Sequence, residues 1–235
     1  MSEFADLSFD AAKFAGKARL FPLPDLVMFP HVLQPLHIFE PRYRAMFEAA
    51  LADDQLLAMA VLAPGWEKNY EGRPALQPFA CLGRIATHQR LADGRYNLLL
   101  QGVRRVKLLH ELPAKFTYRE AEVEICEDIY SPHAAPSRPR LRRRLVESFK
   151  QLLPTLPDAH EQLDQLLGSE LPLGMLTDLV AYALDLGMEL KQQLLGEVDV
   201  DIRAQLLLDR LGRLSTEPLG NAGRGNSFPP DFSLN

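Results

Sequence analysis

Five prolines lie between Arg19 and Tyr43 and separate short apolar runs. Proline has a fixed φ and no backbone N–H, so it does not fit the interior of a helix or of a central strand. The stretch is therefore predicted to form short extended pieces and bends. Pro41 is placed to open a helix over residues 41–52. The apolar residues of that helix recur on one face at helical spacing: Tyr43, Met46, Phe47, Ala50 and Leu51.

The next part of the chain has the pattern of β-structure. Residues 55–62 are almost wholly apolar, which suits a buried strand. Strand-like runs at 82–91 and 95–101 flank the dipeptide at 93–94, and Asp-Gly between two such runs predicts a hairpin.

Gly102 is expected to interrupt the second of these runs, so that residues 103–109 form a separate strand. Residues 118–125 alternate between polar and apolar side chains, so one face of that strand should be exposed. Many short strands with one helix predict a small, partly closed β-barrel.

A proline-rich segment at 127–139 precedes a change to helical periodicity. One apolar stripe runs through Leu141, Leu145, Val146, Phe149, Leu152 and Leu153. Further helices are predicted over 158–168, from Pro172, around 190–195, and after a cap at Asp199 or Asp201. The predicted fold class is α+β, a β-rich pseudo-barrel domain followed by a C-terminal helical bundle. Its parts are a tail (1–18), the barrel (19–128), a linker (129–139), the bundle (140–215) and a disordered tail (216–235).

The composition argues against several classes of protein. A net charge of −5 gives no reason to expect nucleic acid as a partner. Cys81 and Cys126 lack metal-binding spacing, which argues against a disulfide framework and a zinc site. No metal and no cofactor is expected. No apolar run has the length of a membrane span, and the first residues are acidic where a secretory signal would be basic. We therefore expect a cytoplasmic location. Exposed phenylalanines are costly, so we expect Phe4, Leu7, Phe9 and Phe14 to dock on the body of the protein, the alternative being a partner.

Three blocks of sequence, in order, carry a resemblance to a known family. They are Phe-Pro-Leu-Pro (21–24) to His-Ile-Phe-Glu-Pro-Arg-Tyr (37–43), Cys-Leu-Gly-Arg-Ile (81–85) to Gln-Gly-Val-Arg-Arg (101–105), and three helical pieces within 176–207. Over residues 19–214 the chain resembles the N-terminal, substrate-binding domain of the Lon protease family, in the version that occurs alone. The resemblance implies a pseudo-barrel followed by a helical bundle that holds polypeptides.

The motif residues that carry this resemblance are interpreted as structural. They are Pro22, Pro24, Phe29, Pro30, Pro35, His37, Phe39, Glu40, Pro41, Arg42, Tyr43, Asp93, Gly94, Gly102 and Arg105. Glu40 stands where a helix N-terminus stabilises a carboxylate.

Motifs for catalysis are missing from the sequence. It has no Gly-x-x-x-x-Gly-Lys-Ser/Thr for phosphate binding and no Lon-type catalytic serine pattern. The first hypothesis is therefore a non-catalytic module that recognises unfolded or degron-bearing polypeptides, or adapts them to a separate protease, in proteolysis or quality control. The alternatives are a hydrolase with an unrecognised site around Glu40 and His37, and a structural protein that oligomerises through its helical half. The sequence does not indicate an oligomeric state.

Two segments are candidates for binding. The loop 64–78 and the residue just after it hold Trp66, Tyr70 and Phe79, and such aromatic side chains are enriched at recognition sites. The alternative is that they only fix the loop to the barrel. The second candidate is a run of five arginines, which either forms a solvated face paired with acidic neighbours or contacts an anion or nucleic acid. Its members are Arg138, Arg140, Arg142, Arg143 and Arg144.

Overall fold

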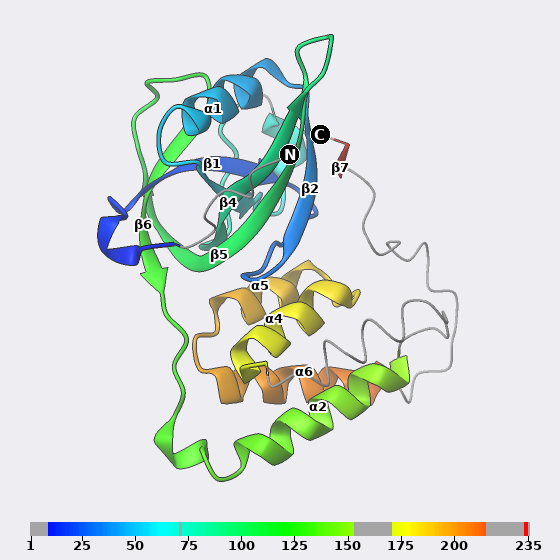
Figure 1. Ribbon diagram of the computed structural model, residues 1–235. Helices are drawn as coiled ribbons and strands as arrows, with labels where there is room; N and C mark the ends of the chain where they lie inside the picture. Colours follow the sequence, from blue (N-terminus) through cyan, green and yellow to red (C-terminus); the bar gives the residue numbers. More distant parts are fainter. Residues whose placement is uncertain (1–8, 71, 153–170, 215–232, 235) are drawn as a thin grey trace. The chain divides into compact units, whose positions relative to one another are not determined.

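The computed structural model describes residues 9–70, 72–152, 171–214 and 233–234. The chain divides into two compact units. The first unit contains Met1–Glu127, Gly187–Gly196 and Asn226–Asn235, and the second contains Asp128–Leu186 and Glu197–Gly225. Figure 1 traces both units along the chain. No helix among the described residues has the length and apolar character needed to cross a bilayer.

The first unit is built on a closed circuit of five strands. They are β1 (Lys17–Leu23), β3 (Leu56–Val61), β4 (Phe79–Arg90), β5 (Tyr96–Glu111) and β6 (Arg119–Cys126). β1 and β3 are parallel, while β3–β4, β4–β5, β5–β6 and β6–β1 are antiparallel. Two further strands, β2 (Leu33–Ile38) and β7 (Ser233–Leu234), extend the sheet beyond β5. The predicted β-rich barrel is therefore confirmed.

Both prolines that lie within strands avoid the cost of a missing N–H in the middle of a sheet. Pro22 lies past Leu20, where the pairing of β1 with β6 ends and only β3 remains beside it. Pro35 lies in β2, next to the outer edge of the sheet. These positions agree with the rule that proline occurs at strand ends and sheet edges.

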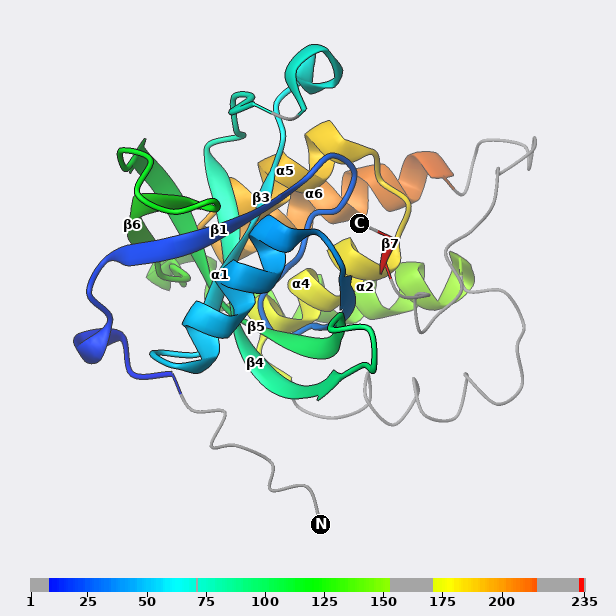
Figure 2. The same ribbon diagram turned by 90° about the horizontal axis from the view of Figure 1, so that it is seen from above.

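Helix α1 (Pro41–Leu51) confirms the helix predicted at Pro41. It packs across one end of the barrel, as Figures 1 and 2 show from two directions. Its buried face meets aromatic side chains of the strands: Tyr43 lies 4.6 Å from Phe21, and Phe47 lies 4.8 Å from Tyr96, between ring centroids. The predicted hairpin is also confirmed, since Gly94 has φ 81° and β4 and β5 pair on either side of the turn.

The expected break at Gly102 is wrong, because β5 continues through it as one strand. A Cβ at this position would lie 2.1 Å from the carbonyl oxygen of Phe29. The backbone just before β2 makes two hydrogen bonds with Gly102. His31 N–H donates to Gly102 O, and Gly102 N–H donates to Val32 O, each at 2.8 Å. The glycine therefore permits a close approach of two backbones within a sheet rather than ending a strand.

The described part of the N-terminal tail docks on the barrel as expected. Phe9 and Phe14, on either side of the 3-10 turn η1 (Ala11–Lys13), pack against a buried apolar cluster of the barrel. Their rings lie 5.8 Å apart. Phe4 and Leu7 lie outside the described residues.

Helix α5 (Met188–Gly196) belongs to the first unit although its neighbours in sequence belong to the second. Arg105, a buried residue of β5, donates from Nε to the carbonyl of Leu195 at 3.1 Å. The ring of Phe79 lies against Gly196, where a Cβ would come within 2.5 Å of it. The helical segment predicted over 140–215 thus contributes to both units, because two barrel residues hold the C-terminal end of α5.

The second unit contains α2 (Arg138–Leu152), α4 (Leu173–Ala183) and α6 (Val200–Leu214), preceded by the short turn η3 (Pro132–Ala134). Asp199 is the cap of α6, since its Oδ1 accepts from the N–H groups of Asp201 and Ile202. The helix predicted over 158–168 lies outside the described residues.

Arg203 holds the centre of the second unit together and is fully buried. Its two terminal nitrogens donate to the two carboxylate oxygens of Asp128 at 3.0 and 2.9 Å. Its Nε donates to Thr177 Oγ1 at 2.8 Å and lies 3.7 Å from the buried carboxylate of Asp178. The guanidinium of Arg203 therefore joins α6 to α4 and to the segment before α2.

The tail predicted to be disordered differs from the expectation at two residues. Ser233–Leu234 forms the strand β7, which pairs in parallel with Leu36 and His37 of β2. The reason is that β2 is the last long strand of the sheet and offers a free edge. Residues 216–232 and 235 lie outside the described residues.

Candidate functional site

The loop 64–78 is fixed at both of its ends. Ala63 N–H donates to Ala75 O, and Gln77 N–H donates to Val61 O, each at 2.8 Å. Between these bonds lies the 3-10 turn η2 (Trp66–Asn69), which begins after Gly65 in a left-handed conformation with φ 89°. A surface loop whose ends are held together in this way can present side chains in a defined position.

Trp66 and Tyr70 meet in this loop, and Tyr70 contacts the start of α1. Their ring centroids are 5.6 Å apart in an edge-to-face arrangement. The Tyr70 hydroxyl donates to Glu40 Oε1 at 3.0 Å, and Arg42 Nε donates to Glu40 Oε2 at 2.9 Å. Tyr70 therefore anchors the loop, while Trp66 is half-buried beside it.

Arg42 completes this cluster. Its guanidinium lies over the rings of Tyr43 and Tyr70, 4.7 and 5.0 Å from their centroids. Partial burial and the hydrogen bond to Glu40 raise the pKa of the Tyr70 hydroxyl above its usual value. The hydroxyl therefore stays protonated and remains a donor to Glu40 throughout the neutral range.

Glu40 holds the N-cap position of α1, but its side chain makes no cap hydrogen bond. Its carboxylate instead joins the helix to the loop through Arg42 and Tyr70. No local signal could have revealed this role, because Glu40 and Tyr70 lie 30 residues apart.

Phe79 does not join the pair formed by Trp66 and Tyr70. It is the first residue of β4, and its ring covers Gly196 of α5. The structure thus brings together two of the three aromatic candidates and gives the third a packing contact with a helix.

His37 and Glu40, the residues of the hydrolase alternative, each have separate partners. His37 Nδ1 lies 2.7 Å from Asn97 Oδ1, and its ring stacks on Phe39 with centroids 6.0 Å apart. Phe39 is 40% exposed, as an aromatic ring next to the edge of the sheet.

The remaining motif residues lie in turns and packing contacts. Phe29 and Pro30 are buried beside Gly102, and Pro24 is half-buried after β1. Asp93 accepts hydrogen bonds from the backbone and side chain of Arg95 in the hairpin, and these bonds lower the pKa of the Asp93 carboxyl.

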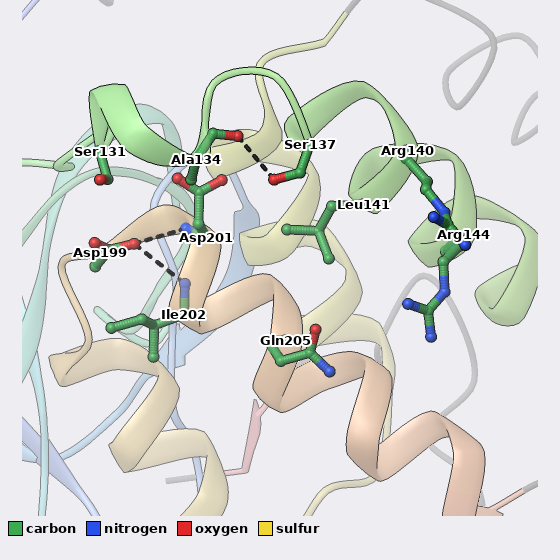
Figure 3. Close-up of a pocket in the computed structure, with 10 residues that line it drawn as sticks. All are labelled: Ser131, Ala134, Ser137, Arg140, Leu141, Arg144, Asp199, Asp201, Ile202 and Gln205. Atoms are coloured by element: carbon green, nitrogen blue, oxygen red, sulfur yellow. Dashed lines mark hydrogen bonds between the residues drawn. The ribbon is translucent and has the colours of Figure 1, made fainter.

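The arginine run lies on α2 and borders a hollow in the second unit with a volume of about 600 Å³. Figure 3 shows Arg140 and Arg144 at one side of this hollow and Asp199 and Asp201 at the other. Arg138 donates to both carboxylate oxygens of Asp201, at 2.9 and 2.6 Å, so one arginine has an acidic neighbour as partner.

The other arginines of the run differ from Arg138. Arg142 donates to the carbonyl of Leu171 at 3.4 Å. Arg140, Arg143 and Arg144 make no ion pair with any other residue that the structure describes. The two acidic groups of the hollow are already engaged, Asp199 as a helix cap and Asp201 by Arg138.

Both cysteines are free thiols, and Cys81 is buried as a small apolar residue of β4. Within residues 9–70, 72–152, 171–214 and 233–234, no group of three or more His, Cys, Asp or Glu side chains is placed to hold a metal ion.

Comparison with solved structures agrees with this architecture. The N-terminal domain of Lon protease from the Mycobacterium avium complex matches with a TM-score of 0.65 and 18% identity, over 83% of this chain and 98% of that one. The Lon N-terminal domain protein from Xanthomonas campestris matches with a TM-score of 0.58 and 21% identity, over 82% of this chain and 97% of that one. At these identities the likeness concerns the fold.

Curated sequences give the same family. The chain is 28% identical over 200 residues to Lon protease from Anaeromyxobacter dehalogenans, and this alignment covers 83% of the chain and 23% of that protein. Lon protease 1 from Bdellovibrio bacteriovorus is 25% identical over 225 residues, which is 94% of this chain and 28% of that protein. The chain thus spans about a quarter of the length of these relatives. Because the model of the ATP-dependent protease La (LON) substrate-binding domain matches residues 17–213, the chain belongs to that family.

Proposed function

We propose that this chain is a non-catalytic module that binds unfolded or degron-bearing polypeptide segments and passes them to a separate protease. The observation that carries the proposal is the match to a substrate-binding domain over residues 17–213. The relatives are named Lon protease, so the substrates of such a domain are polypeptides. The free thiols of Cys81 and Cys126 fit a reducing, cytoplasmic location.

The loop 64–78 supplies a binding surface consistent with this role. Tyr70 is held by Glu40, and the backbone of the loop is bonded at both ends. We therefore expect the half-buried Trp66, packed on Tyr70, to contribute an aromatic face at a fixed position. Rigid aromatic side chains give contact area at a small cost in conformational entropy.

The experiment measures the affinity of the protein for fluorescently labelled, reduced and carboxymethylated casein by anisotropy. Truncation of an aromatic side chain at a binding centre costs about 2 kcal/mol, so Trp66→Ala should weaken binding by roughly thirtyfold. The melting temperature should stay nearly unchanged. Phe116→Ala is the matched control, because Phe116 is an exposed aromatic residue (43%) on the hairpin between β5 and β6. It should leave the affinity unchanged.

Two results would contradict the proposal. If Trp66→Ala lowers the melting temperature by many degrees and leaves the affinity per folded molecule intact, Trp66 is a structural anchor. If the wild-type protein does not bind unfolded casein, the binding function itself is refuted.

The non-catalytic part has its own assay. Purified protein should neither hydrolyse ATP nor cleave casein. Turnover that disappears on substitution of one residue of this chain would refute that part of the proposal.

A further inference from the structure

Among the described residues, β7 pairs with only part of the outer edge of β2. β2 has six residues, and β7 pairs with two of them, Leu36 and His37. Figure 1 shows β7 beside β2, at the side away from β5. The observed register gives residues 33–35 no opposite residue in β7.

The hydrogen bond from Gly102 N–H to Val32 O, at 2.8 Å, determines which backbone groups face this edge. In an antiparallel pair the residues alternate between bonding the partner strand and facing away from it. Since Val32 bonds β5, so do Gln34, Leu36 and Ile38, each opposite a residue of β5 in the observed register.

The backbone groups of Leu33, Pro35 and His37 therefore face outward. Pro35 has no N–H to offer, and its carbonyl accepts from Gln34 Nε2 at 3.0 Å. The parallel register with β7 also turns this carbonyl toward Ser233. The missing N–H falls on the outer side, so the pairing of β2 with β5 remains complete.

The side chains beside this edge form an apolar stripe. Leu33 is 51% exposed and Phe39 is 40% exposed, and between them lie the half-buried Pro35 and His37. Phe39 stacks on His37, so the two rings lie on the same side of the chain. A strand edge that the described residues pair only in part, next to exposed apolar side chains, has the features of β-augmentation. In that mode main-chain bonds give affinity and alternate side chains give specificity.

We propose that the outer edge of β2 binds an extended, apolar polypeptide segment as an added parallel strand. Ser233–Leu234 occupies part of this edge as a self-ligand, which a longer segment displaces because it pairs along the whole of β2. This inference rests on the proposed function, and it assigns the bound polypeptide to a defined strand edge.

The test uses a labelled heptapeptide of alternating valine and threonine, together with the same peptide N-methylated at every residue. N-methylation removes the backbone donors and keeps the side chains. The first peptide should bind and the second should not. Deletion of Ser233–Asn235 frees the edge, so it should tighten binding of the first peptide by about fivefold or more.

Leu33→Lys places a charge beside the edge and should weaken binding of the heptapeptide by about tenfold. Leu109→Lys is the matched control, because Leu109 is a leucine of β5 that is equally exposed at 52%. It should bind the heptapeptide as the wild-type protein does. Circular dichroism of each variant verifies that the fold is retained.

The outcomes separate the two proposals. If unfolded casein binds, while the deletion leaves heptapeptide affinity unchanged and Leu33→Lys behaves like Leu109→Lys, the edge proposal is overturned and polypeptide binding stands. Equal binding of the N-methylated peptide also overturns it. If neither casein nor the heptapeptide binds the wild-type protein or the deletion variant, both proposals fail.

Discussion

Gly102→Ala should destabilise the first unit strongly, because the new Cβ would meet backbone atoms rather than a movable side chain. It would lie 2.1 Å from Phe29 O and 3.0 Å from both Phe29 C and Pro30 Cα. The two backbones would have to separate by about 1 Å, and such overpacking costs roughly 1–3 kcal/mol.

The separation would also weaken the two 2.8 Å hydrogen bonds that His31 and Val32 make with Gly102. Each is worth about 1 kcal/mol. The reduced entropy of the unfolded chain returns roughly 0.4–1 kcal/mol, so the free energy of unfolding should fall by about 2–4 kcal/mol.

Urea unfolding followed by fluorescence measures this change, because Trp66 is the only tryptophan and lies in the first unit. Gly212→Ala is the control. Nothing lies within 4 Å of a Cβ at Gly212, and alanine in a helix is favoured over glycine by roughly 0.5–1 kcal/mol. A Gly102→Ala variant as stable as the wild-type protein would refute the close approach of the two backbones.

Three further predictions concern ionic groups. Arg203→Met should lower the free energy of unfolding by about 3–5 kcal/mol, because the carboxylate of Asp178 remains buried without its cation. Thermal unfolding followed by circular dichroism measures this loss, with Arg138→Met, which breaks a less buried ion pair, as the control. An equal loss of stability in both variants would contradict this reason. Burial raises the pKa of Glu111, but hydrogen bonds from Arg119 and Arg73 outweigh it and hold that pKa below its usual value. Glu111 therefore adds stability above about pH 4.3, its unfolded pKa, and loses it as the pH falls through the lower folded pKa. Urea unfolding at a series of pH values should show a shallower acid decline for Glu111→Gln, and an unchanged decline would refute this assignment. Arg105→Met should speed hydrogen exchange in α5 more than in α6, because the carbonyl of Leu195 loses its donor; equal protection in both helices would argue against that role.

Local patterns in the sequence predicted the parts of the fold that depend on neighbouring residues. Proline at the first turn and an apolar stripe predicted α1, and Asp-Gly between two strand-like runs predicted the hairpin. In both cases the residues that determine the structure lie within about one turn or one hairpin of each other.

The parts that the sequence did not predict depend on residues brought together only by folding. A glycine within a strand-like run predicts a break at Gly102. The close approach of Phe29 that explains this glycine is hidden in the sequence, because the two residues are far apart along the chain. The cluster of Arg203 joins residues 26 and 75 positions apart, and no periodicity marks such a partner. In the candidate site, the aromatic loop could be recognised from composition, while the bond from Tyr70 to Glu40 that holds it could not.

The position of α5 determines when the barrel can be completed during synthesis. Arg105 and Leu195 are 90 residues apart, so β5 leaves the ribosome well before the helix that accepts its buried guanidinium. Until then Phe79 and Arg105 lack their contacts with α5, and α2 and α4 are translated in the meantime. Domains generally fold as units in the order in which they are made. Here the first unit cannot be completed until α5 is made, and α5 follows most of the second unit in the sequence. A nascent chain stalled before residue 196 would therefore carry an unfinished barrel.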